Sequence, residues 1–182
     1  MRVVLAASIA LVIITPTWGH AQESTASQIA RATSAGPPSI RDDAAVMTVD
    51  AQGHMSPLKK GSNGWTCFPR DIGTPTESPL CFDRQGLAWY EAAMMGKAPD
   101  PDSVGLSYML QGGSVWSNIH GDATKPEPGQ NTYVSVPPHV MILSAKVAAA
   151  SGYPSGQVNP DTSKPFVMQG GGPLAIVIMP VK

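Results

Sequence analysis

The chain has 182 residues, a formal net charge of −1 and only 14% charged residues, so it lacks the basic field that nucleic-acid binding requires. Its hydrophobic content of 42% excludes an intrinsically disordered chain. Its 18 glycines and 18 prolines make up about a fifth of the chain, against an average of about 12% for the two together. This composition predicts short strands joined by many turns. We therefore expect one domain with no nucleic-acid partner.

Residues 1–21 have the layout of a cleaved secretory signal. Arg2 supplies a positive charge, and residues 3–14 form an uncharged apolar run that is too short to span a bilayer comfortably. The small residues Gly19 and Ala21 are spaced like a signal-peptidase site. We therefore expect cleavage near Ala21 and a periplasmic or secreted protein with no stable membrane anchor.

Residues 22–45 are predicted to form a flexible or weakly helical arm. Their apolar face is thin, and the run Gly36-Pro37-Pro38 stops any helix. A single domain is expected to follow over residues 46–182.

Three short β-rich stretches open this domain, and turns separate them. They occupy residues 46–50, 54–60 and 65–68, and the simplest arrangement for them is an antiparallel meander. Pro57 has no N–H to donate, so its strand should lie at a sheet edge or at a bulge.

One principal helix is predicted over residues 83–96. Asp83 is a suitable N-cap, Gly96 is a suitable C-terminal stop, and the apolar residues between them follow helical spacing.

Four further strands are predicted at residues 104–110, 138–144, 166–169 and 174–181. The last two form a C-terminal hairpin, and the apolar run around Val177 fits a strand that is buried on both faces. We therefore predict an α+β domain. It has a small antiparallel β-sheet (a meander plus the C-terminal hairpin), one principal helix, one disulfide and many loops.

The two cysteines, Cys67 and Cys81, are expected to form that disulfide, because cysteines in exported chains usually pair. They close a loop of about 15 residues, for which the chain-entropy model gives roughly 3 kcal/mol. A redox pair usually has the closer C-x-x-C spacing, and two cysteines alone cannot complete a structural zinc site.

Residues 114–138 are the strongest candidate for a binding loop, because the segment is long, polar and poor in apolar anchors. We expect its tryptophan, together with Trp65, to give apolar contact while nearby polar side chains orient a ligand. The expected ligand-binding residues are Trp65, Trp116, Asn118, Asp122 and His139.

A metal site is an alternative use of the same region. His120 and Asp122 flank a glycine, and His139 begins the next predicted strand, so imidazole and carboxylate together could hold zinc or another divalent metal. No paired spacing such as H-E-x-x-H supports this site.

Other motifs predict no chemistry. The S-x-x-K match at residues 56–59 lacks the S-D-N and K-T-G elements of penicillin-binding enzymes, and no phosphate-binding or dinucleotide fingerprint is present. The methionines lie mainly in apolar strand or helix contexts, so we expect core packing rather than copper ligation.

Several sequence blocks taken together resemble a family of small exported bacterial proteins. The blocks are GSNGWTCFP, YMLQGG, SN followed by ATKP, PPHVMI, DTSKP and the terminal IMPVK. The resemblance covers roughly residues 46–182 and implies an independent exported domain, but it carries no catalytic residue over to this chain.

The sequence therefore predicts a non-catalytic binding or interaction domain that needs no cofactor and whose partner is a small molecule or a protein. The alternative is a metal-assisted hydrolase that uses His120, Asp122 and His139 as ligands.

Overall fold

The computed structural model describes residues 23–71, 73–130 and 132–181. The predicted signal of residues 1–21 and its cleavage point near Ala21 lie outside the described residues. In chain order the elements are α1 (Thr25–Ser34), α2 (Pro38–Arg41), β1 (Ala45–Val49), β2 (Met55–Lys59), β3 (Thr66–Phe68), β4 (Leu80–Phe82), α3 (Arg84–Met94), β5 (Gly105–Met109), β6 (Gly113–Val115), β7 (Val134–Val136), β8 (His139–Leu143), α4 (Ala145–Ala150), β9 (Phe166–Met168) and β10 (Ile176–Pro180).

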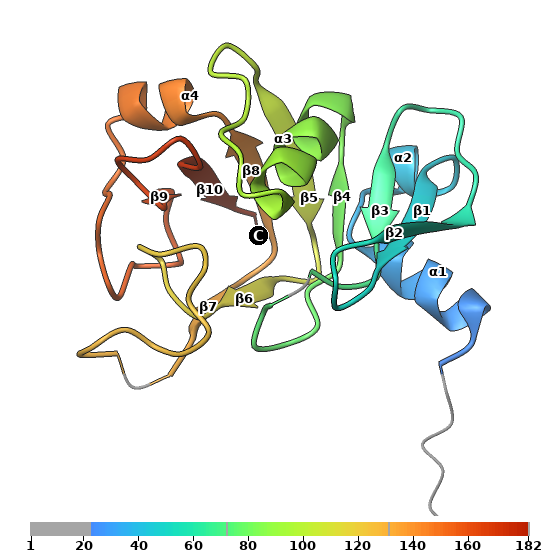
Figure 1. Ribbon diagram of the computed structural model, residues 1–182, viewed down its shortest axis with the longest axis horizontal. Coiled ribbons are helices and arrows are strands. Elements are labelled where there is room, and N and C mark those ends of the chain that lie inside the picture. Colours follow the sequence, from blue (N-terminus) through green and yellow to red (C-terminus); the bar gives the residue numbers. More distant parts are fainter. Residues whose placement is uncertain (1–22, 72, 131, 182) are drawn as a thin grey trace, which may run out of the picture.

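An eight-stranded sheet with the order β2-β1-β3-β4-β5-β8-β10-β9 forms the centre of the molecule (Figure 1). The strands β6 and β7 make a separate two-stranded ribbon. The α+β class, the disulfide and the C-terminal hairpin of β9 and β10 are confirmed. The sheet is larger than predicted, because β4 and the long-range pairing of β5 with β8 join the first strands to the C-terminal strands in one sheet.

The first three strands do not form a simple meander. β1 pairs with β2 in antiparallel fashion but with β3 in parallel. β2 carries Pro57 and lies at the sheet edge, as expected, so β3 adds to the free side of β1. The turn after β2 passes tightly over the start of β1, where a Cβ added at Gly61 would lie 2.0 Å from the backbone nitrogen of Ala45.

The sheet has two covered faces, because successive side chains of a strand point to opposite sides. One face, here called the α3 face, packs Phe68, Phe82 and Ile178 with residues of α3. The opposite face packs the disulfide against α1 and packs Val177 against α4.

The predicted arm is part of this packing. Its residues form α1 and α2, and Ala32 and Ala35 are fully buried beside the disulfide. The segment is therefore a packed part of the fold and not a flexible arm. Its small alanine side chains allow close contact with the sheet, although they give the isolated segment little apolar surface.

The helix α3 begins where predicted, with Asp83 as its N-cap. The Asp83 carboxylate accepts hydrogen bonds from the backbone N–H of Gly86 at 2.7 Å and of Leu106 at 3.0 Å, so one side chain caps the helix and joins it to β5. At the contact between helix and strand, a Cβ added at Gly105 would lie 2.4 Å from the backbone nitrogen of Gly86.

This contact gives a first prediction. Gly105→Ala should lower the free energy of unfolding by at least about 1–3 kcal/mol, because backbone and not a flexible side chain opposes the new methyl group. The matched control is Gly172→Ala, where the nearest atom to an added Cβ is 3.9 Å away. Urea denaturation of both variants tests this, and equal stability of the two would contradict the close contact.

The disulfide gives a second prediction. Cys67 and Cys81 are direct cross-strand partners in β3 and β4, fully buried, and 14 positions apart in sequence. The double variant Cys67→Ala with Cys81→Ala should lose about 3 kcal/mol of unfolding free energy relative to the oxidised protein. Two free thiols in protein recovered from its native compartment, shown by mass spectrometry, would contradict the bridge.

Candidate functional site

A cavity of about 940 Å³ opens on the α3 face of the sheet. The helix α3 covers only part of this face, and loops close over the remainder. The floor is apolar and includes Met109, Met141, Ile176 and Ile178 from β5, β8 and β10. The polar groups around it are Arg70, Asp71, Ser114, Asp122, His139 and Gln169.

The helix supplies an aromatic wall. The ring of Tyr90 lies 4.9 Å from that of Phe82 and 5.5 Å from that of Phe68, which fixes its position over β3 and β4. The Tyr90 hydroxyl donates to Asp71 Oδ1 at 2.8 Å, so the aromatic cluster also holds the loop after β3 beside the cavity. Trp89, the next residue on the helix, lines the cavity as well.

The loop closed by the disulfide is held at its far end too. The Thr76 and Ser114 hydroxyls lie 2.6 Å apart, and the backbone N–H of Ser114 donates to the Ser78 hydroxyl at 3.2 Å. The loop is therefore tied to β6 as well as to the sheet, and this brings Arg70 and Asp71 to the cavity.

His139 is a buried ionisable group of the cavity, with only 2% of its surface exposed. Its Nδ1 lies 2.7 Å from the Pro137 carbonyl oxygen, which can only accept, so Nδ1 carries the proton. Burial lowers the pKa of His139 below its ordinary value and favours the neutral ring. Nε2 is then an acceptor, and within the described part of the chain it has no hydrogen-bond partner.

A second polar group of the cavity wall is also unsatisfied. Trp89 Nε1 is buried and has no partner among residues 23–71, 73–130 and 132–181. A buried donor without a partner costs about 1–3 kcal/mol. Two residues that line the cavity, Trp89 and His139, therefore each have one ring nitrogen without a hydrogen-bond partner among the described residues.

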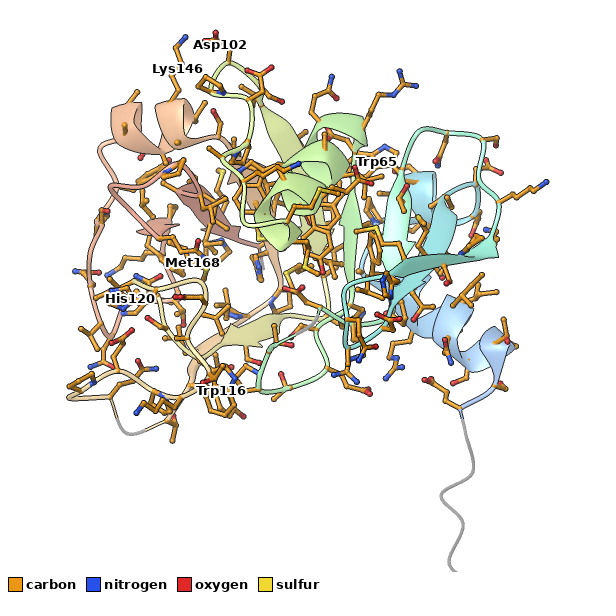
Figure 2. The ribbon with its side chains drawn as sticks, in the orientation of Figure 1. Trp65, Asp102, Trp116, His120, Lys146 and Met168 are labelled. Carbon is orange, nitrogen blue, oxygen red and sulfur yellow. A yellow bond between two sulfur atoms is a disulfide. The ribbon has the colours of Figure 1, made fainter. Side chains whose placement is uncertain are left out.

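The predicted binding residues separate into two groups. Asp122 and His139 line the same cavity, as the sequence interpretation requires. Trp65 lies on the opposite face of the sheet, where its ring is 5.3 Å from that of Tyr108, and Trp116 packs edge-on against Tyr133 at 6.2 Å. Figure 2 shows the two tryptophans in separate parts of the molecule.

Asn118 holds the loop instead of facing the cavity. Asn118 is 1% exposed, its side-chain amide donates to the Gln157 carbonyl at 2.9 Å, and its backbone carbonyl accepts from the Gln169 N–H at 2.8 Å. These contacts tie the segment after β6 to the segments that flank β9, so Asn118 positions Gln169 beside the cavity.

His120 belongs to a surface cluster. Its Nδ1 lies 2.7 Å from Glu127 Oε1, and this hydrogen bond raises the pKa of the exposed His120 ring. The residues that the structure describes include no group of three or more His, Cys, Asp or Glu side chains arranged to hold a metal ion. Of the three residues predicted as metal ligands, Asp122 and His139 share the cavity and His120 lies outside its lining.

The sequence interpretation missed most of the lining. Arg70 was hidden in the disulfide loop, while Trp89 and Tyr90 were recognised only as helical residues. The methionines at 109 and 141 were assigned to core packing. For these two methionines, the available signal is the alternation of their strands, since every second residue of a strand faces the same side.

Comparison with protein-family models, with curated proteins and with solved structures found no match to this chain. No described helix combines the length and apolar character needed to cross a membrane.

The burial of His139 gives a third prediction. Its folded pKa lies below the unfolded value of 6.5, so the unfolded chain takes up a proton first as pH falls and stability decreases through pH 6.5 toward the folded pKa. His139→Gln should remove this component, giving a flatter decrease in unfolding free energy from pH 8 to pH 5. Arg70, Asp71 and Asp122, the other charged cavity residues, are kept in both proteins, as is His120.

Urea denaturation at several pH values measures the difference between the two proteins. Parallel pH profiles would contradict a buried, neutral His139.

Proposed function

We propose that this protein is an exported binding protein for a small amphipathic molecule, held in the cavity on the α3 face. The observation that supports it most is the cavity itself. Its volume of about 940 Å³ lies in the range of small-molecule sites, which are concave, mainly apolar and provided with a few polar groups. An ordinary core would be filled to crystal-like density by its own side chains.

The polar groups indicate what such a ligand contains. Trp89 Nε1 requires an acceptor and His139 Nε2 a donor, while the exposed Arg70 favours an anionic group at the mouth. The lining also holds Asp71, Ser114, Asp122 and Gln169, and the rest of it is mainly aromatic or aliphatic. A compact apolar body that carries a hydroxyl and a carboxylate or sulfonate would satisfy Trp89 Nε1, His139 Nε2 and Arg70.

Export is proposed from the signal-like layout of residues 1–21, which fits the disulfide between Cys67 and Cys81. The site of action would then be the periplasm or the cell exterior. The unidentified partner of the cavity would be a molecule of that compartment, with no requirement for nucleic acid.

The metal-assisted hydrolase remains a second proposal on one observation, that Asp122 and His139 line the same cavity. Zinc loading followed by metal analysis separates the two. Stoichiometric zinc in the wild type and its loss in Asp122→Asn would favour the hydrolase over the non-catalytic binding protein.

A fourth prediction tests the binding proposal. Ala93 is half-buried on α3 and lines the cavity, so Ala93→Phe should fill part of the space. We expect a fluorescent aromatic sulfonate, 8-anilinonaphthalene-1-sulfonate, to bind the folded wild type and to bind the variant at least tenfold more weakly. At a concentration one hundred times its Kd, such a probe should stabilise the wild type by about 2.7 kcal/mol.

The matched control is Met95→Phe, which places the same ring on a residue that is 65% exposed and absent from the cavity lining. Fluorescence titration and thermal melts report on both variants. Equal binding to all three proteins would show that the probe sits elsewhere and would remove the support for the cavity.

A further inference from the structure

Three methionines line the same cavity as the buried His139. Met109, Met141 and Met168 all line the cavity, and all three are more than nine-tenths buried. Met168 reaches the cavity from β9, the strand at the opposite edge of the sheet from β2 (Figure 2). The cavity wall therefore combines thioethers with one imidazole.

Two of these methionines are neighbours of His139 by strand geometry. Met109 of β5 is the direct cross-strand partner of His139, and Met141 lies two positions further along β8 on the same face. Direct partners have Cβ atoms about 4.5–5.5 Å apart, and positions i and i+2 of a strand are about 6.8 Å apart. Three long side chains that begin this close together can bring their ends to one point.

The histidine is oriented as a ligand would be. Histidines that bind metals usually donate their other ring N–H to a carbonyl or a carboxylate, which fixes the tautomer and the ring plane. The bond from His139 Nδ1 to the Pro137 carbonyl does this and leaves the lone pair of Nε2 available.

The donor set selects the kind of cation. Thioether sulfur is a soft ligand that prefers Cu(I), and imidazole binds copper as well. Both cysteines of the chain are bound in the disulfide, so no thiolate competes for such an ion. A single positive charge also costs less to bury than a double one, and the carboxylates of Asp71 and Asp122 line the same cavity.

We propose that His139 Nε2 and the sulfur atoms of Met109 and Met141 form a site for a soft monovalent cation, Cu(I) in the cell. This reverses the sequence expectation that the methionines are only core packing. The proposal does not rest on binding of an organic molecule, because its ligands are side chains of the cavity floor.

The test uses full-length mature protein labelled with ¹³C in the methionine methyl groups and titrated with Ag(I), a redox-stable d¹⁰ ion with the same preference for sulfur. We expect saturation at one equivalent, with the methyl resonances of Met109 and Met141 shifting while those of Met55 and Met179 stay in place. Shifts confined to the exposed Met95, or spread equally over all methionines, would overturn the site.

Matched variants complete the experiment. Met109→Leu and Met141→Leu conserve side-chain volume and should each weaken Ag(I) binding at least tenfold, as should His139→Gln, whereas Met179→Leu should not. Circular dichroism checks that each variant is folded. Wild-type affinity in the Met109→Leu, Met141→Leu double variant would overturn the proposal.

The naphthalenesulfonate titration distinguishes failure of the proposed cation site from failure of the proposed binding function. Loss of the organic probe alone would leave the silver site in place, and loss of the silver site alone would leave the cavity in place.

Discussion

The close packing of α3 on β5 determines where everything else on this face can lie. Gly86 and Gly105 meet with backbone against backbone, and the Asp83 carboxylate bonds to both elements. A helix docked this closely at its first turn cannot shift along the sheet. It presents Trp89 and Tyr90 over the first strands, and the rest of the cavity is lined by residues of β5, β8, β9 and β10 and by loop residues. The position of α3 beside the cavity is thus fixed at a contact between two glycines.

The disulfide has a supporting part in the same arrangement. It lies on the face away from the cavity, among buried alanines of α1 and its neighbours, and it joins the two strands that flank a proline-rich loop. That loop carries Arg70 and Asp71 to the cavity, where the Tyr90 hydroxyl and the hydroxyl contacts to Ser114 hold it. A bridge on one face therefore limits the freedom of functional side chains on the other face.

Local signals in the sequence were sufficient for the principal helix, for the edge position of Pro57 and for the pairing of the cysteines. They were insufficient for β6 and β7, whose three-residue strands lie within an apparent loop and are held by their own pairing and by a hydrogen bond from the Ser114 N–H to the Ser78 hydroxyl. Residues that meet through long-range register were also beyond prediction. The alternation of His139 and Met141 is visible in one strand, but nothing local shows that Met109 lies opposite them.

His139 shows why this face is more than a loosely filled core. A polar group that loses water on folding without gaining a partner costs about 1–3 kcal/mol, so histidines in a filled core have partners for both ring nitrogens. Here one nitrogen is satisfied by Pro137, and the other is left beside the cavity together with an unpartnered indole N–H among the described residues. An occupant that completes these bonds, whether an organic molecule or a soft cation, would remove this cost.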